Sequence, residues 1–93
     1  LLTKRFFNLD DRCYEDGELD RATKEMLGLA ASLVLRCDDC IQYHIVTAVE
    51  NGVSRKQLME VFDIGLVVGG SIVIPHLRRA VRAWAEITDG AER

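Results

Sequence analysis

Two cysteines and a histidine lie on one predicted helical stripe, at Cys37, Cys40 and His44. Side chains three and four residues apart share a face of an α-helix, so the two sulfur atoms and the imidazole are expected to lie close together. Two sulfur atoms one turn apart can form a disulfide, and an imidazole beside them can accept or return a proton. This spacing predicts a thiol redox site.

The reactivity of such a pair depends on its thiolate fraction, because the thiolate is the attacking species. A helix that begins at Cys37 would stabilise negative charge on sulfur, and His44 could act as the base. Asp38 and Asp39 oppose this effect, since nearby negative charge raises the pKa of a thiol. The pattern fits reduction of a peroxide through a sulfenic acid, and it equally fits exchange with the disulfide of a partner protein.

Two other interpretations of the cysteine pair stay open. Cysteine is among the most frequently buried residue types, so Cys37 and Cys40 could simply pack inside a non-catalytic oligomeric domain. The other interpretation is a zinc site with Cys37, Cys40, His44 and His76 as ligands. Structural zinc sites usually have a second closely spaced ligand pair, whereas His76 stands alone after Pro75. We therefore expect no metal and no cofactor.

The elements that position the cysteines are predicted to be helices, and the fold class is all-α. A helix with one buried face is expected over 21–35, with Asp20 as its N-cap. The polar residues after Cys37 favour a new helix N-terminus there, and this second helix is expected to run to Asn51. Gly52 ends it with a left-handed residue. The cysteine pair is thus predicted at the start of the second helix.

The second half of the chain is also predicted to be helical. Ser54 and Gln57 form an expected capping box for a helix that starts at Arg55 and extends to about Gly65. The apolar sequence beyond it is expected to be a helix that the Gly69-Gly70 pair and Pro75 interrupt or kink. A last amphipathic helix is predicted over 75–87.

The two ends of the chain carry weaker patterns. Segment 1–16 is charged and is expected to be irregular, and 88–93 is expected to be a polar tail. Cys13 has no partner nearby in the sequence and is predicted to be a free thiol.

Arg78, Arg79 and Arg82 form a basic strip on the last predicted helix, which is either a solvated face or a contact for an anion.

The composition indicates one small domain, 1–93, that assembles with copies of itself. Hydrophobic residues make up 48% of the 93 residues, which is more than one small core can easily bury. The glycine-rich apolar run over 64–74 is the expected contact, because an all-apolar helix must be buried on every side. Gly65, Gly69 and Gly70 would let a neighbouring backbone approach closely.

The charge and the hydropathy exclude some partners. A net charge of -3 and a pI near 5.3 argue against binding to nucleic acid. The longest uncharged run, 64–74, is shorter than the ~20 residues that a membrane-spanning helix needs. The first ten residues do not resemble a secretory signal, and three cysteines do not resemble a secreted disulfide framework. We therefore expect a cytoplasmic protein that binds neither membranes nor nucleic acids.

The residues from Glu25 to His44 resemble a known family. A glutamate twelve residues before a CxxCxxxH pattern is typical of the alkylhydroperoxidase D-like branch of the carboxymuconolactone decarboxylase family, and Glu25, Cys37, Cys40 and His44 have that spacing. The sequence Asn51-Gly52-Val53 adds to the resemblance. Without the resemblance, Glu25 would be interpreted as a surface charge paired with Arg21, one helical turn earlier.

The resemblance implies an all-helical fold, a symmetric trimer or hexamer, and thiol peroxidase chemistry. It implies that Cys40 attacks the substrate and becomes a sulfenic acid, and that Cys37 resolves it. Glu25 and His44 would form a proton relay. The substrate would be a peroxide or another small molecule, with a partner protein as reductant. One residue departs from the pattern, because alkylhydroperoxidase D has a histidine where this chain has Asp39, so the relay is incomplete or altered.

A lactone decarboxylase like the namesake of the family is the alternative enzyme. Its chemistry does not depend on the cysteine pair and needs a base together with a pocket that holds an anion. The candidates in this sequence are His44, His76 and the arginines of the basic strip.

Overall fold

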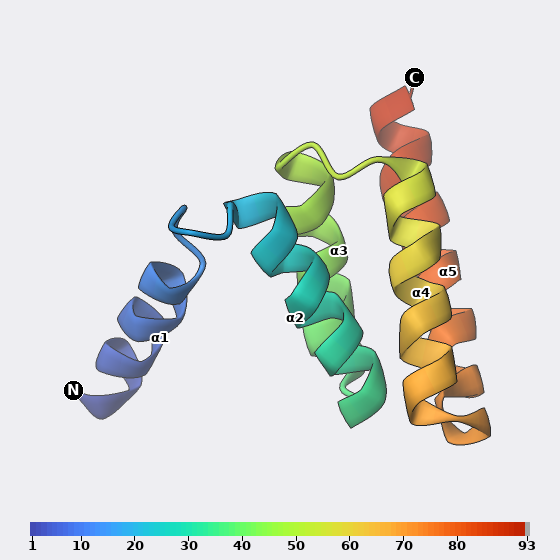
Figure 1. The fold of residues 1–93 in the computed structure, drawn as a ribbon, viewed down its shortest axis with the longest axis horizontal. Helices are drawn as coiled ribbons and strands as arrows, with labels where there is room; N and C mark the ends of the chain where they lie inside the picture. Colours follow the sequence, from blue (N-terminus) through green and yellow to red (C-terminus); the bar gives the residue numbers. More distant parts are fainter. Residues whose placement is uncertain (93) are drawn as a thin grey trace.

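Two helical hairpins form the body of the molecule in a computed structural model that describes residues 1–92, with side chains through Thr88 (Figure 1). Helix α2 packs against both α3 and α4, and α3 packs against α5, whereas α1 lies to one side (Figure 1). No strand occurs in residues 1–92, which confirms the all-α prediction. The elements are α1 (Leu2–Cys13), α2 (Arg21–Leu35), α3 (Asp38–Glu50), α4 (Arg55–Gly69), a 3₁₀ turn (Ser71–Val73) and α5 (Ile74–Glu92).

The helix boundaries follow from local capping. Asp20 caps α2 by accepting a hydrogen bond from the Thr23 amide at 2.8 Å. Ser54 and Gln57 form the predicted capping box of α4. Gly70 ends α4 with a φ of +80°, a conformation that glycine adopts without strain. The helix therefore continues past the expected end near Gly65 and stops at the glycine pair.

The prediction for segment 1–16 was wrong, because Leu2–Cys13 is helical. The signal was present as a stripe of Leu2, Phe6 and Leu9 at helical spacing. None of the residues of α1 is buried within this chain, so the stripe has no partner here. The predicted polar tail is also helical as far as Glu92, and Arg93 lies outside the described residues.

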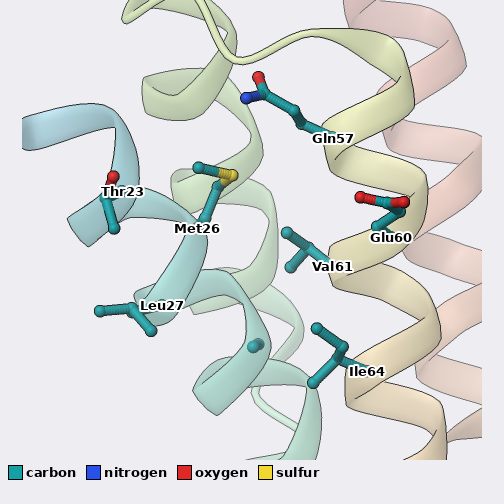
Figure 2. A pocket seen from close by; sticks show the side chains of 8 residues that line it. Thr23, Met26, Leu27, Gln57, Glu60, Val61 and Ile64 are labelled. Carbon is teal, nitrogen blue, oxygen red and sulfur yellow. The ribbon is translucent and has the colours of Figure 1, made fainter.

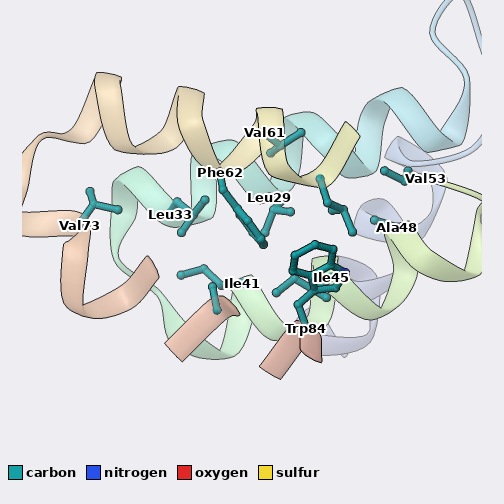
Figure 3. Packing of buried hydrophobic residues seen from close by; sticks show 12 residues of the cluster. Leu29, Leu33, Ile41, Ile45, Ala48, Val53, Val61, Phe62, Val73 and Trp84 are labelled. Atoms are coloured by element: carbon teal, nitrogen blue, oxygen red, sulfur yellow. The ribbon is translucent and has the colours of Figure 1, made fainter. Parts of the chain in front are cut away.

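One hydrophobic core holds the two hairpins together, as Figure 3 shows. Phe62 of α4 meets Trp84 of α5 edge to face, with ring centroids 5.7 Å apart. Complete burial of a leucine or isoleucine stabilises the fold by about 1.5–3 kcal/mol each. The large, fully buried members on α2 and α3 are Leu29, Leu33, Ile41 and Ile45. They fix the relative position of the two helices that carry the predicted site.

Two of the three glycines of the 64–74 run, Gly65 and Gly69, make close contacts within the chain, whereas a Cβ on Gly70 would meet nothing within 4 Å. A Cβ on Gly65 would lie 2.8 Å from Leu33 Cδ1, and one on Gly69 would overlap Val73. The expected burial on every side is not reached in this chain, since Val67 is 83% exposed. A contact between subunits through this run stays a prediction.

An apolar cavity of about 370 Å³ lies between α2 and α4 (Figure 2). Its lining includes Met26 and Leu27 from α2 and Val61 and Ile64 from α4. No cysteine or histidine lines it, so it offers no thiol redox group, and Glu60 is the titratable side chain of its lining. Within the described residues, every helix is too short or too polar to cross a bilayer.

Candidate active site

The cysteine pair lies at the start of α3, where the sequence predicted it. Arg36 ends α2 in the left-handed conformation, with a φ of +60°, and the chain then turns directly into α3. Cys37 is the N-cap of α3, and its Sγ accepts a hydrogen bond from the Cys40 amide at 3.3 Å. The two cysteines form a disulfide, with Cα atoms 5.3 Å apart. A helix N-terminus stabilises negative charge, so this position favours a thiolate after reduction.

The two sulfurs differ in their access to solvent. Cys37 is partly buried, whereas Cys40 is exposed. Cys40 also lines a cavity of about 440 Å³ together with His44 and Tyr43 of α3. Helix α1 provides the opposite wall through Phe6, Phe7, Asp10 and Asp11, and Asp39 completes the lining. A small molecule in this cavity would reach Cys40.

A buried acid–base pair stands beside the cysteines. Glu25 is fully buried on α2, so its interpretation as a surface charge is wrong. Its Oε2 lies 2.9 Å from His44 Nδ1 and also accepts a hydrogen bond from the Thr47 hydroxyl. The other oxygen, Oε1, lies 3.7 Å from Arg21 Nε. Glu25 thus orients the imidazole of His44, which is itself part of the cavity lining.

Two further residues hold the imidazole in place. The Tyr14 hydroxyl lies 3.5 Å from His44 Nε2, on the side opposite Glu25. Gly28 gives the ring its space, because a Cβ there would lie 2.7 Å from His44 Cε1 and 2.6 Å from Tyr14 Oη. Burial, followed by the negative charge of Glu25, raises the pKa of Tyr14 and keeps its hydroxyl protonated as a donor.

Sequence reasoning missed Tyr14, Gly28 and Thr47. Thr47 could have been found, because it lies three residues after His44 on the same helical face. Gly28 follows Glu25 by three residues and could have been recognised as the small neighbour of a buried carboxylate. Tyr14 gave no local signal, because it follows a segment predicted to be irregular.

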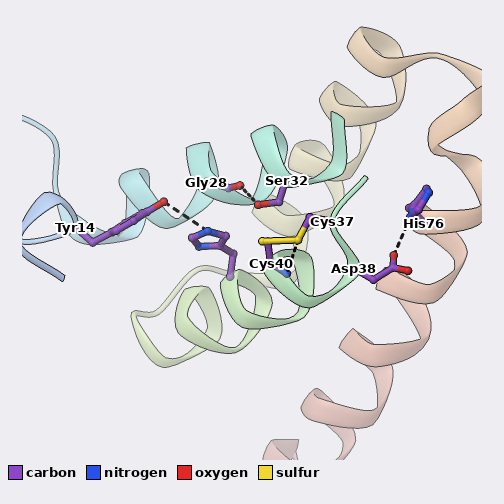
Figure 4. Close-up of a disulfide and its surroundings, with 8 residues drawn as sticks. Tyr14, Gly28, Ser32, Cys37, Asp38, Cys40 and His76 are labelled. Atoms are coloured by element: carbon purple, nitrogen blue, oxygen red, sulfur yellow. Dashed lines mark hydrogen bonds and ion pairs between the residues drawn. A yellow bond between two sulfur atoms is a disulfide. The ribbon is translucent and has the colours of Figure 1, made fainter. Parts of the chain in front are cut away.

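The two aspartates between the cysteines, Asp38 and Asp39, have different surroundings. Asp38 points away from the disulfide toward α5, as Figure 4 shows, and accepts hydrogen bonds from His76 and Arg79. These partners, with the His76 bond as the larger effect, lower the pKa of Asp38. Asp39 stays at the cavity. One of the two charges expected to oppose a thiolate is therefore compensated.

His76 lies outside the cavity that contains Cys40 and His44. It binds Asp38 at 2.9 Å through Nδ1, and Arg79 Nη2 approaches the same nitrogen at 3.2 Å. Among the described residues, no three cysteine, histidine or acidic side chains converge as a set of metal ligands. Cys13 is a free, exposed thiol, as predicted.

Known proteins share both this sequence and this fold. One is a carboxymuconolactone decarboxylase family protein of Thermotoga maritima, for which a role in the antioxidative response has been suggested. Its crystal structure is known, and its sequence is 59% identical to this chain. The match covers 97% of this chain and 93% of that chain, with a TM-score of 0.93. Another is a carboxymuconolactone decarboxylase family protein from Legionella pneumophila, whose structure was solved in the apo form. Its sequence is 29% identical over 92% of this chain and 77% of that chain, with a TM-score of 0.85.

Two uncharacterised bacterial proteins are also similar. One, encoded in the cox locus of Paracoccus denitrificans, is 30% identical over 92% of this chain and 77% of its own length. The other, from Cupriavidus necator, is 38% identical over 60% of this chain and half of its own length. The sequence profile described as the Carboxymuconolactone decarboxylase family matches residues 1–91. The chain therefore belongs to the carboxymuconolactone decarboxylase family.

Proposed function

We propose that this protein is a thiol–disulfide oxidoreductase with peroxidase-type activity. The observation that carries the proposal is the common cavity of Cys40 and His44, with the partner sulfur Cys37 and the carboxylate Glu25 directly behind them. Thiol redox chemistry needs the two sulfurs, Cys37 and Cys40, to exchange electrons and the Glu25–His44 pair to move protons. The suggested antioxidative role of the Thermotoga maritima protein agrees with this function.

Cys40 is the attacking thiolate in this proposal, because it is the more exposed of the two cysteines and lines the cavity. It attacks one oxygen of a hydroperoxide, the O–O bond breaks, and a sulfenic acid forms on Cys40. The leaving alkoxide takes a proton and departs as an alcohol, and His44 is placed to supply that proton. The peroxide is reduced by two electrons from sulfur.

Cys37 then completes the cycle. Its thiol condenses with the sulfenic acid, water leaves, and the Cys37–Cys40 disulfide forms. A dithiol or a reducing partner protein returns two electrons and two protons to the disulfide by thiol–disulfide exchange. The Glu25–His44 pair would take up the proton released when the next Cys40 thiolate is generated.

Peptide mass mapping tests the function directly. The reduced protein should lose the free thiols of Cys37 and Cys40 on mild peroxide treatment and recover them with dithiothreitol. Cys40→Ser should abolish catalysed peroxide turnover, and Cys37→Ser should accumulate a sulfenic acid on Cys40. Cys13→Ser is the matched control and should behave as the wild type, because Cys13 is an exposed thiol outside the cavity.

Two outcomes would refute the proposal. The first is unchanged peroxide turnover in both Cys37→Ser and Cys40→Ser. The second is a disulfide that forms in the wild type no faster than in a short peptide with the same CxxC sequence. Lactone decarboxylation that survives both substitutions would instead support the alternative enzyme.

A further inference from the structure

The lining of the cavity beside Cys40 is rich in aspartate. Of its eight lining residues, three are aspartates and none is lysine or arginine. Asp10 and Asp11 come from α1, and Asp39 comes from the first turn of α3. None of the three forms an ion pair within the part of the chain whose side chains are described. Their charges therefore act on whatever enters the cavity.

Three cations of the described chain are engaged elsewhere, and Lys4, Arg5 and Arg12 of α1 lie outside the cavity lining. Arg21 lies against buried Glu25, and Arg79 binds Asp38 on the side that faces α5. Lys24 donates hydrogen bonds to two main-chain carbonyl groups at the end of α1 and just beyond it. The acidic side chains also affect the cavity wall, because the pKa of Tyr43 is raised by burial and then by Glu25, Asp10 and Asp11, with Arg21 opposing.

The remaining lining is largely aromatic. Phe6 and Phe7 of α1 face Tyr43 of α3 across the cavity that contains Cys40. A volume of about 440 Å³ is in the range of small-molecule sites. The match to the Thermotoga maritima structure covers 97% of the chain, so α1 is part of the shared fold. The cavity thus combines apolar walls, a reactive sulfur and three unpaired carboxylates.

We propose that this cavity selects uncharged or cationic disulfides and hydroperoxides with an apolar body, and that Asp10, Asp11 and Asp39 exclude anionic ones. The proposal rests on the thiol–disulfide function and specifies its substrate class. Like charges repel at the encounter and in the bound state, so an anionic substrate reacts more slowly even when its sulfur or oxygen chemistry is the same.

The step that reports this selectivity is reduction of a small disulfide by the reduced enzyme. One cysteine thiolate attacks a sulfur of the disulfide, which breaks the S–S bond and releases one thiolate. The second cysteine attacks the mixed disulfide, forms the Cys37–Cys40 bond and releases the second thiolate. Two electrons pass from the enzyme to the substrate, and the released thiolates take up the two protons that the enzyme thiols lose.

Three disulfides of similar size provide the test: cystamine, which is cationic, bis(2-hydroxyethyl) disulfide, which is neutral, and 3,3′-dithiodipropionate, which is anionic. Each rate constant with the reduced enzyme is divided by the rate constant of the same disulfide with dithiothreitol, which removes intrinsic reactivity. The normalised cystamine rate should exceed the dithiodipropionate rate by at least about 10-fold at low ionic strength, and the difference should shrink in high salt.

The triple variant Asp10→Asn, Asp11→Asn, Asp39→Asn should reduce this ratio to about 2. A changed thiolate fraction in the variant affects all three disulfides equally and cancels in the ratio. The matched control is Glu18→Gln, Asp63→Asn, Glu86→Gln, which removes three exposed carboxylates outside the cavity and should keep the wild-type ratio. Circular dichroism checks that both variants keep the helical content of the wild type.

The outcomes separate the two proposals. An equal ratio in the wild type and in the cavity variant would overturn the charge selectivity, as would an equal loss of the ratio in the control variant. Failure of the wild type to react with the neutral disulfide faster than its unfolded, reduced chain would instead refute the thiol–disulfide function itself.

Discussion

His44 is positioned by three neighbouring residues. Glu25 binds its Nδ1 atom, Tyr14 approaches its Nε2 atom, and Gly28 lies against the ring. An imidazole that transfers protons needs a fixed orientation as much as a suitable acid strength, since a displacement of about 1 Å can reduce a rate 100-fold. The small size of Gly28 is therefore as important to the candidate site as the polar partners.

Gly28→Ala tests this role of size. The new methyl group would lie within 2.7 Å of His44 Cε1 and even closer to the Tyr14 hydroxyl, so both side chains must move. Peroxide turnover should fall by about 10- to 100-fold. Urea denaturation should show a loss of about 1–3 kcal/mol in the free energy of unfolding, which is typical of overpacking.

Gly17→Ala is the matched control, because the nearest atom to its new methyl group is Lys24 Nζ at 3.6 Å, an ordinary contact. It should keep wild-type turnover. Wild-type turnover in Gly28→Ala as well would show that the observed position of His44 is not required for the reaction.

At the scale of elements, the start of α3 is tied to α5 by one aspartate. Asp38 accepts hydrogen bonds of 2.9 Å from both His76 and Arg79, which lie one turn apart on α5. This link draws Asp38 away from the cysteines and joins the two helical hairpins near the disulfide (Figure 4). The link should therefore affect both the stability of the fold and the redox properties of the cysteine pair.

The lowered pKa of Asp38 gives this link a pH dependence with a definite sign. Its contribution to stability is fully present above the usual aspartate pKa of ~3.9 and is lost as the pH falls through the lower value in the folded state. Asp38→Asn should therefore destabilise the protein at pH 7 and have a smaller effect at pH 3. Urea denaturation of both proteins at the two pH values measures the difference.

The effect at pH 7 should stay below about 1 kcal/mol, because the side chains of Asp38 and Arg79 are 37% and 52% exposed and solvent screens the pair. Asp63→Asn, a substitution of an exposed aspartate on α4, serves as the control. A destabilisation by Asp38→Asn that is larger at pH 3 than at pH 7 would contradict the assignment.

At the scale of the whole molecule, apolar side chains remain exposed on α2 and α4. Leu35, Val67 and Val68 are all more than two-thirds exposed, and Ile64 lies beside them. Leu35, Ile64 and Val68 also line an apolar hollow of about 450 Å³ between the two helices. A soluble monomer rarely leaves so large an apolar face uncovered, so we predict that a second copy of the chain covers it.

Val67→Glu should disrupt this assembly, because it places a charge among the exposed apolar residues of α4 at a position that is 83% exposed in the chain. Light scattering should show a lower mass than for the wild type, with unchanged helical content. Lys56→Glu changes an exposed residue at the other end of α4 and should leave the mass unaltered. Gly69→Leu is a poorer test, since its side chain would meet Val73 of the same chain.

The sequence predicted most of the fold because the relevant signals are local. Asp20, Ser54 with Gln57, and Gly70 each define a helix end through residues within a few positions of themselves. Helix α1 was missed because its charged residues suggested an irregular segment, although Leu2, Phe6 and Leu9 have helical spacing. None of its residues is buried, so the stripe is a weaker signal than the core-facing stripes of the other helices.

The candidate site was likewise predictable only where its residues are close in the sequence. The spacing of Cys37, Cys40 and His44 predicted their common location, because one turn of helix joins each to the next. The position of Tyr14 could not be predicted, since it depends on how the segment after α1 packs near Gly28 of α2 and His44 of α3. The hydrogen bonds of Asp38 could not be predicted either, because its partners lie 38 and 41 residues away on α5.

The sulfur of Cys37 serves two purposes at once, since the atom that shares the disulfide also accepts a hydrogen bond from an amide in the first turn of α3. In the proposed function, electron transfer and the capping of a helix end therefore depend on a single atom. The amide proton of Cys40 should report the oxidation state without any label, through its chemical shift and its rate of exchange with solvent. Alkylation of Cys37 would remove both roles in one reaction, so helix fraying should accompany inactivation.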